Sequence, residues 1–271
     1  MKYLNKFIKQ LLCKAGQITL PVSTDSICVD LIDAYKSTFS KEVSDLELTI
    51  ALSRIAFNSH LRSIIKGFRT DLVIDVGANK GQFGQQLRRL GYTGTIWSFE
   101  PMTSHHQSLS VLCNSLPPWK LFKHACGEVF SRRTLSVTKD DSCSSFLTAN
   151  EFGKRELGHF LNETRVESDV DVFPLDMVLE NNPIKDFSSI LLKTDTQGFD
   201  DKVLAGAELL LEKVSVVLCE TAFRPIYENA PHSSVITSML AKKHFKQGCI
   251  FPIAYSTQNG ELIEADTFFV K

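Results

Sequence analysis

The sequence lacks the features of disulfide-rich, zinc-binding and membrane-spanning proteins. Its seven cysteines are scattered and form no Cys-x-x-Cys pair, so neither a disulfide framework nor a zinc site is indicated. No stretch reaches the roughly 20 apolar residues that a transmembrane helix needs. We therefore expect a cytoplasmic protein with reduced cysteines and no transmembrane segment.

An excess of positive charge is also missing. Lysine and arginine together number 30, against 31 for aspartate and glutamate, which gives a formal net charge of −1. A near-neutral chain lacks the excess of positive charge that binds a phosphate backbone, so we expect no nucleic-acid partner. Hydrophobic residues make up 43% of the 271 residues, which is enough for a packed core.

The order of the predicted elements indicates two regions. Residues 1–69 read as helical, with helices at 29–39 and 44–68, where Ser44 is a candidate cap and Gly67 a candidate stop. From residue 70 strands and helices alternate. Strands are predicted at 72–76, 95–99, 121–126, 134–138, 171–173, 189–194, 214–219, 248–255 and 267–270, and helices at 82–90, 104–116, 175–180, 200–213 and 233–244. A turn at Asn259-Gly260 joins the last two strands, so the pattern predicts a doubly wound α/β sheet with one reversed edge strand.

The first candidate ligand-binding segment follows the strand at 72–76. It reads Asp75-x-Gly77-x-Asn79-x-Gly81. Its glycines let the backbone turn sharply and approach a ligand closely. The helix that starts near residue 82 points its N-terminal amides at the same place, where a carboxylate fits. Asp75 can accept a hydrogen bond from an ammonium group or from bound water.

A carboxylate stands at the end of the next strand. Glu100 lies about 20 residues after Gly77, which is the spacing of the acidic residue that holds ribose hydroxyls in nucleoside-binding α/β folds. Two acceptor oxygens on one carboxylate suit a vicinal diol. Pro101 and Met102 follow directly and can flank an adenine ring.

Two further carboxylates, Asp195 and Glu220, end the strands at 189–194 and 214–219. Ligands of α/β sheets bind beyond the carboxyl ends of the strands, so both side chains belong at the mouth of one crevice. Each feature alone has a plainer explanation, as a turn, a helix cap or a solvated side chain. Their combination, with a strand before and a helix after, favours a nucleoside-binding site.

The nucleoside need not belong to a dinucleotide. A dinucleotide fingerprint is Gly-x-Gly-x-x-Gly, and here Asn79 stands at the second glycine. The sequence also has no Tyr-x-x-x-Lys pair, P-loop, Gly-x-Ser-x-Gly elbow or His-Glu-x-x-His motif. An NAD(P)-dependent oxidoreductase on a related fold stays open as the main alternative.

Several segments together resemble the FkbM-type class I methyltransferases, which use S-adenosylmethionine. The resemblance extends from residue 71 to about residue 220 and leaves the first seventy residues outside. The segments that carry it are residues 73–84, 99–101, 124–128, 142–146, and 192–199 with 203–207.

The resemblance implies a Rossmann-like, seven-stranded methyltransferase domain at 70–271, with residues 1–69 as a helical cap or dimerisation segment. S-adenosyl-L-methionine is the implied cofactor, and a homodimer is one arrangement that the helical segment allows. The implied reaction is O-methylation of a hydroxyl on a sugar, glycan, polyketide or other small metabolite. The residues assigned to the cofactor are Asp75, Gly77, Asn79, Gly81, Phe83, Glu100, Pro101, Met102, Ala125 and Cys126.

An aliphatic hydroxyl needs a base or a strong hydrogen-bond acceptor as it attacks. Asp195 is the first candidate for that group and Glu220 the second, because each ends a strand in the crevice. The histidines at 105, 106 and 124 have no spacing that singles them out, and no metal ligands are predicted. Gln197 stands where the family usually has Glu, so a cofactor-binding module without activity also stays open.

Overall fold

The computed structural model describes residues 45–161 and 163–271. By its contacts the chain divides into two compact units, Met1–Thr49 and Ile50–Lys271. Of the first unit only residues 45–49 are described, as the start of helix α3 (Asp45–Gly67). The helix predicted at 29–39 and the candidate cap Ser44 lie outside the described residues. All other described elements belong to the second unit.

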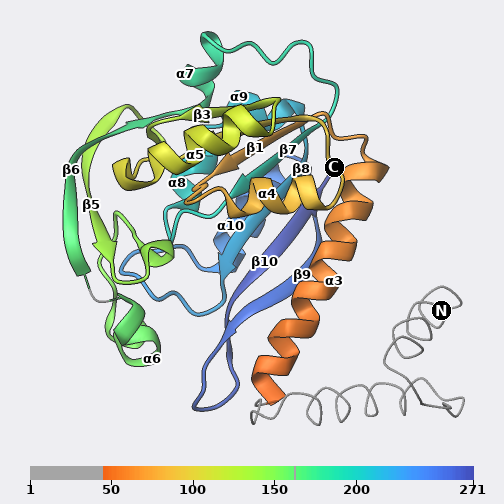
Figure 1. The fold of residues 1–271 in the computed structure, drawn as a ribbon. Coiled ribbons are helices and arrows are strands. Elements are labelled where there is room, and N and C mark those ends of the chain that lie inside the picture. The colour runs from red at the N-terminus through yellow and green to blue at the C-terminus, as the bar shows by residue number, and fades with distance from the viewer. Residues whose placement is uncertain (1–44, 162) are drawn as a thin grey trace, which may run out of the picture. The chain divides into compact units, whose positions relative to one another are not determined.

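Helix α3 confirms the helix predicted at 44–68, with Gly67 at its end. It is anchored by Phe57 and Leu61, which are buried, whereas Ile55 is exposed. The Phe57 ring contacts Phe251 and Phe268, each with ring centroids 5.6 Å apart. The helix therefore lies along the last two strands of the sheet, as Figure 1 shows.

A seven-stranded sheet forms the centre of the unit and confirms the predicted fold class. Its order is β3-β2-β1-β7-β8-β10-β9. The antiparallel pair predicted at the end of the chain is confirmed, and the reversed strand, β10, lies one place in from the edge, between β8 and β9. The strands are β3 (Trp119–Phe122), β2 (Thr95–Phe99), β1 (Leu72–Val76), β7 (Ile190–Thr194), β8 (Val214–Ala222), β10 (Leu262–Val270) and β9 (Lys246–Tyr255).

The register of the parallel strands brings their carboxyl ends to one edge. Val76 of β1 pairs with Phe99 of β2 on one side and with Thr194 of β7 on the other. Thr194 pairs in turn with Cys219 of β8. Glu100 and Asp195 follow the ends of β2 and β7, and Glu220 follows Cys219 within β8, which continues beyond its predicted end at residue 219 to Ala222, so the three carboxylates lie at the same edge.

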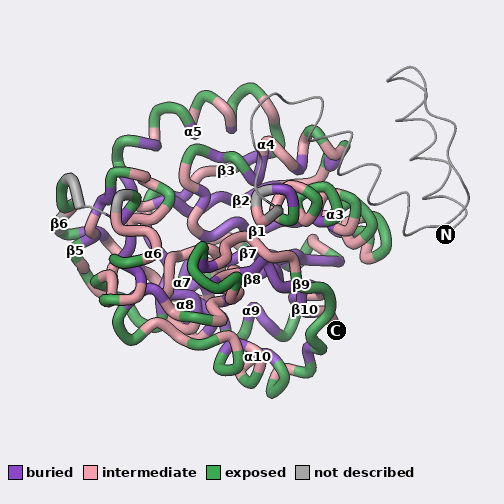
Figure 2. The backbone as a smooth tube through the Cα atoms, turned by 90° about the horizontal axis from the view of Figure 1, so that it is seen from below, coloured by how far each residue is buried: buried purple, intermediate pink, exposed green. Residues whose placement is uncertain are grey.

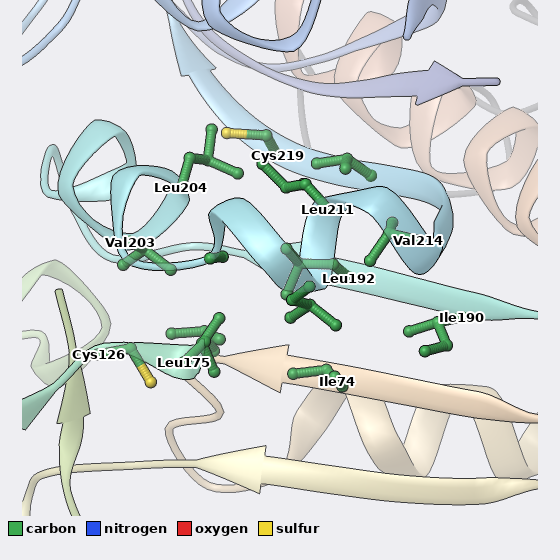
Figure 3. Close-up of a cluster of buried hydrophobic side chains, with 14 of the residues drawn as sticks. Ile74, Cys126, Leu175, Ile190, Leu192, Val203, Leu204, Leu211, Val214 and Cys219 are labelled. Atoms are coloured by element: carbon green, nitrogen blue, oxygen red, sulfur yellow. The ribbon is translucent and has the colours of Figure 1, made fainter. Parts of the chain in front are cut away.

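Successive side chains of each strand point to opposite faces, and helices cover both. Val73 packs with helices α3, α4 (Gln82–Arg89) and α5 (Thr103–Ser115) through residues such as Leu61, Leu87 and Leu109. Its neighbour Ile74 belongs to the opposite core, with α7, α8, α9 and α10. Figure 3 shows this second core, and Figure 2 shows the central strands buried within the unit. The four helices are α7 (Leu175–Glu180), α8 (Asp200–Ala205), α9 (Glu208–Lys213) and α10 (Ser233–Lys242).

A second, three-stranded sheet was only partly predicted. The single strand predicted at 121–126 is wrong, because the chain leaves the main sheet after β3 and residues 125–126 form β4 in the other sheet. That sheet has the order β4-β6-β5. Its buried face packs on Met102 and Phe199, beside the carboxyl ends of the main strands. Its strands are β4 (Ala125–Cys126), β6 (Glu163–Phe173) and β5 (Ser131–Thr138), and the segment between β5 and β6 holds the short helix η1 (Asp141–Cys143) and helix α6 (Glu151–Leu161).

The single helix predicted at 200–213 is two helices, α8 and α9. They are separated at Gly206, where a Cβ atom would lie 1.9 Å from the carbonyl oxygen of Gly127. This close backbone approach turns the chain between the two helices. No helix in residues 45–161 and 163–271 is long and apolar enough to cross a membrane.

Candidate functional site

A cavity of about 340 Å³ lies at the carboxyl ends of β1, β2, β7 and β8. Its size falls within the usual range of small-molecule sites, roughly 300–1,000 Å³. The cavity is lined by ten of the twelve predicted site residues: Gly77, Asn79, Phe83, Glu100, Pro101, Met102, Ala125, Cys126, Asp195 and Glu220. Asp75 and Gly81 are not among its lining residues and lie behind it.

The loop after β1 is built on left-handed backbone. Gly77 and Gly81 have φ of 81° and Asn79 has φ of 48°, a region that glycine and asparagine adopt most readily. A Cβ at Gly77 would lie 1.9 Å from the carbonyl oxygen of Asp195, so only glycine fits between the loop and the end of β7. A Cβ at Gly81 would instead meet Leu109, 2.9 Å away, on the helix side.

Asp75 supports the loop through a buried lysine. Its Oδ1 lies 3.2 Å from Nζ of Lys193, which is also 3.3 Å from Oδ2 of Asp195. Burial raises the pKa of Asp75, although Lys193 opposes this effect. Burial alone would lower the pKa of Lys193, but the two aspartates outweigh it and hold the ammonium charged. Lys193 thus joins the loop after β1 to the carboxylate that ends β7.

Glu100 is buried, and its two oxygens hold two loops at once. Oε2 accepts a hydrogen bond of 2.7 Å from the backbone amide of Asn79. Oε1 accepts one of 2.8 Å from the amide of Met102. A carboxylate has about four acceptor positions, so positions are left for a ligand diol on the side that lines the cavity.

A chain of charged groups ties the serine-rich segment at 142–146 to this end of the cavity. Asp141 Oδ2 lies 2.6 Å from Nζ of Lys80 and 3.1 Å from Nε2 of His105. His105 is buried, with Nδ1 3.7 Å from Oε1 of Glu100. Its pKa is raised by Glu100 first and by Asp141 as well, against the effect of burial. The segment therefore closes over the cavity through an ionic contact to the loop after β1.

The three histidines that were weak candidate bases lie outside the lining of the cavity. His105 bridges the two carboxylates described above. Nε2 of His106 lies 2.9 Å from the carbonyl oxygen of Glu100, and His124 Nδ1 lies 3.0 Å from that of Ala125. In the described part of the chain, no group of three or more His, Cys, Asp or Glu side chains could hold a metal ion.

At the opposite end of the cavity, the carboxylates of Asp195 and Glu220 share one amide. Nε2 of Gln197 donates to Oδ1 of Asp195 at 3.2 Å and to Oε1 of Glu220 at 2.8 Å. The hydroxyl of Tyr227 donates to Oε1 of the same glutamine at 2.9 Å. The sequence identified both carboxylates but not this bridge, because residues 197, 220 and 227 form no local motif.

More acidic groups lie behind this pair. Burial, and then the charge of Asp195, raise the pKa of Glu220 well above the usual glutamate range. The same two effects raise the pKa of Glu264 to about 7 and that of Asp266 to about 6. Asp266 faces Arg54 of α3 at 3.6 Å, and both line the cavity. Sequence reasoning missed Arg54, because its helix lay outside every recognised motif.

Comparison with known proteins gives the family. A family model described as the methyltransferase FkbM domain matches residues 75–247. No individual curated protein matches the chain in sequence.

Solved structures with a similar fold include several methyltransferases. The precorrin-6y C5,15-methyltransferase of Geobacter metallireducens is 7% identical, with coverage of 78% of this chain and 87% of that one and a TM-score of 0.40. The magnesium protoporphyrin IX methyltransferase of Synechocystis, solved with bound S-adenosylmethionine, is 8% identical, with coverage of 94% and 100% and a TM-score of 0.40. The 1,6-didemethyltoxoflavin-N1-methyltransferase of Burkholderia thailandensis is 11% identical, with coverage of 94% and 93% and a TM-score of 0.42.

These identities and TM-scores carry no argument about the acceptor. The family model, however, spans more than half of the chain and includes the loop after β1, Glu100 and Asp195. The protein therefore belongs to the FkbM-domain methyltransferases, a family that uses S-adenosylmethionine as its methyl donor.

Proposed function

We propose that the protein methylates a hydroxyl group of a sugar, glycan, polyketide or other small metabolite, with Glu220 as general base and Asp195 beside it. The observation that carries this proposal is the pair of carboxylates bridged by one amide at the end of the cavity away from Glu100. A hydroxyl becomes a good nucleophile only when a base takes its proton, and a carboxylate within hydrogen-bond reach can do so.

The residues present fit the cofactor at the other end. The first amides of α4, at Gln82 and Phe83, would hold the methionine carboxylate, because both residues line the cavity and the amides of residues 77–81 already donate within the protein. Glu100 would hold the ribose hydroxyls, and Pro101, Met102, Ala125 and Cys126 would enclose the adenine. When bound, S-adenosylmethionine supplies a methyl group that its sulfonium already activates. The protein's own work is then to orient the acceptor, exclude water and take the proton.

The surroundings of the two carboxylates favour Glu220 over Asp195 as the base. Oδ2 of Asp195 lies 3.3 Å from Nζ of Lys193 and its Oδ1 accepts from Gln197, so both oxygens of that carboxylate are already engaged. Among the described residues no cation lies within ion-pair distance of Glu220. Burial and the charge of Asp195 raise the pKa of Glu220, so its carboxylate takes up a proton more readily than an ordinary glutamate does. This reverses the order suggested by the sequence.

The acceptor atom is tested with S-adenosylmethionine that carries a deuterated methyl group. The protein is incubated with pools of small hydroxylated metabolites, and labelled products are isolated and examined by NMR. We expect a methoxy carbon in the labelled product. Labelled N-methyl or C-methyl products alone would contradict O-methylation, and cofactor binding without transfer to any pool would indicate a binding module.

Glu220→Gln is expected to lower the single-turnover rate of methyl transfer about 100-fold, because the amide cannot take the proton. Asp195→Asn is expected to cost about ten-fold or less. In the wild type the rate should rise with pH through the raised pKa of Glu220, since only the ionised form is a base. Glu261→Gln, which changes an exposed ion pair with Arg224, is the matched control. A larger loss for Asp195→Asn than for Glu220→Gln would restore Asp195 as the base.

Asp141→Ala is expected to speed the dissociation of S-adenosylhomocysteine about five- to ten-fold. The substitution removes the contacts of Asp141 with Lys80 and His105 that close the serine-rich segment over the cavity. Stopped-flow fluorescence with a competing ligand measures this rate. Asp171→Ala removes a comparable but exposed ion pair with Arg132 and should leave the rate unchanged. Equal rates in all three proteins would show that the segment does not retain the ligand.

A further inference from the structure

The side chain of Gln197 is held at every polar atom. Its Nε2 group has two hydrogens, and these point to Asp195 and to Glu220, at 3.2 and 2.8 Å. Its Oε1 accepts from the hydroxyl of Tyr227 at 2.9 Å. The side chain lines the cavity, yet no polar atom is left over for a ligand.

The observed orientation of the amide suits two ionised carboxylates. Ionised carboxylates accept hydrogen bonds and cannot donate them, and the NH2 group faces Asp195 and Glu220. The oxygen then faces Tyr227, whose hydroxyl can donate to it. The same hydroxyl, which has one hydrogen, also lies 2.8 Å from the carbonyl oxygen of Cys143, in the serine-rich region, so the two oxygens share that hydrogen. The two carboxylates are thus the main partners that orient the amide.

The backbone of Gln197 is fixed as well. Its φ is 52°, a left-handed value that a residue other than glycine adopts only where its surroundings hold it. The hydroxyl of Ser145 donates to its carbonyl oxygen at 2.7 Å. Hydrogen bonds thus hold both the backbone carbonyl and the side chain of Gln197 in this strained conformation. Strain that is maintained in this way indicates that the side chain has a role at this position.

The electrostatic surroundings of the pair explain why such a side chain is needed. Two carboxylates that face one another repel, and one of them tends to keep a proton unless a cation or hydrogen-bond donors lie between them. Lys193 reaches only Asp195 of the two. The other charged or titratable groups around the pair are Asp200, Glu264, Asp266 with Arg54, Cys143, Cys219 and Tyr227, and the acidic ones add to the repulsion.

We propose that Gln197 is a positioning residue that holds Asp195 and Glu220 side by side in their ionised forms, in the place where a cation would otherwise stand between them. The proposal rests on the proposed function, because Asp195 and Glu220 are the two carboxylates proposed to act on the acceptor hydroxyl. Gln197 itself takes no proton and does not touch the acceptor. It leaves the second oxygen of Glu220 to act on the hydroxyl, because Oε1 is occupied by the amide.

The test compares the melting temperature of Gln197→Glu with that of the wild type at pH 8 and pH 5.5. At pH 8 the variant places three carboxylates together and loses two hydrogen bonds to charged groups, so we expect its Tm to fall by about 6 °C or more. The neighbouring charges raise the pKa of the new carboxyl in the folded state. Its cost is therefore fully present above that folded-state pKa, shrinks as the pH falls, and vanishes only below the unfolded-state pKa of about 4.3.

At pH 5.5 a protonated carboxyl can donate its one hydrogen to one of the two carboxylates, whereas the amide donates to both, so we expect the difference in Tm to shrink to about half of its value at pH 8 or less. Gln85→Glu adds the same charge on α4, outside the cavity lining, and should show no such dependence on pH. Gln197→Met keeps the size of the side chain without its donors, and should also lose more at pH 8 than at pH 5.5. If Gln197→Glu does not fold at pH 8, the Tm of Gln197→Met is compared with that of the wild type in its place.

A loss of Tm that is equal at both pH values would show a merely structural role, and Gln197→Met as stable as the wild type at pH 8 would overturn the proposal. These measurements need neither acceptor nor methyl transfer. Their outcome is therefore independent of the proposed O-methylation, which is tested by the labelled products.

Discussion

Glu100→Ala is expected to weaken the binding of S-adenosylhomocysteine by roughly 1,000-fold, or about 4 kcal/mol. Two hydrogen bonds from the ribose to a charged group are lost, at about 1.5–3 kcal/mol each. The carboxylate also holds the amides of Asn79 and Met102, so its removal loosens both loops that line this end of the cavity. Isothermal titration calorimetry with the purified variant measures the change.

A matched control is available at the start of α5. The carboxylate of Glu167 accepts a hydrogen bond from the amide of Thr103, the first residue of that helix, but Glu167 does not line the cavity. Glu167→Ala should therefore leave the affinity within about two-fold of the wild type. An unchanged affinity in Glu100→Ala would remove the ribose assignment, whereas an equal loss in both variants would indicate a general effect on α5.

Gly77→Ala is expected to destabilise the fold by about 4 kcal/mol or more, which lowers the Tm by roughly 8–16 °C. The added Cβ would lie 1.9 Å from the carbonyl oxygen of Asp195, a backbone atom that can move only if β7 moves. The residue also has φ of 81°, where alanine is strained. Thermal unfolding followed by circular dichroism measures the loss.

Gly91→Ala separates the two causes. Gly91 has a similar φ of 88°, but a Cβ there would meet no atom within 4 Å. This variant should lose only the backbone contribution, about 1 kcal/mol. If Gly77→Ala were no worse than Gly91→Ala, the close approach between the loop after β1 and the end of β7 would not exist in solution.

Local sequence patterns were sufficient to predict which residues line the cavity around Glu100. The strand at 72–76, the glycine loop and Glu100 lie within about thirty residues, and the parallel register of β1 and β2 brings them to one edge. The same edge holds Asp195 and Glu220, because β7 and β8 continue the parallel order. Neighbouring strand ends are what a doubly wound fold brings together, so the pattern alone predicts these contacts.

Contacts between distant segments could not be predicted in this way. The ion pair of Lys193 with Asp75 and the hydrogen bond of Tyr227 to Gln197 depend on the packing of the folded chain. A buried lysine in an apolar strand was a usable signal, because burial of an unpaired charge is costly and implies a partner. Nothing in the spacing of Tyr227 singled it out.

The second sheet was hidden by its polar composition. Residues 163–173 alternate in part, but Val166 is exposed and Asp169 has a φ of 57°, which interrupts the strand pattern. At 121–126 the polar pair Lys123-His124 separates two short apolar pairs without a glycine or proline turn signal, although the chain passes from β3 to β4 there. The change of sheet is decided by the packing of Met102 and Phe199 against β5 and β6, which a local pattern cannot show.

The assignment of the two ends of the cavity is tested most directly by a crystal structure of the protein with S-adenosylhomocysteine. We expect both ribose hydroxyls to bond to the carboxylate of Glu100, the amino-acid part of the ligand to lie at the first amides of α4, at Gln82 and Phe83, and the sulfur to face Asp195 and Glu220. A ligand with its adenine toward Asp195 and Glu220, or one whose ribose has no contact with Glu100, would contradict this assignment.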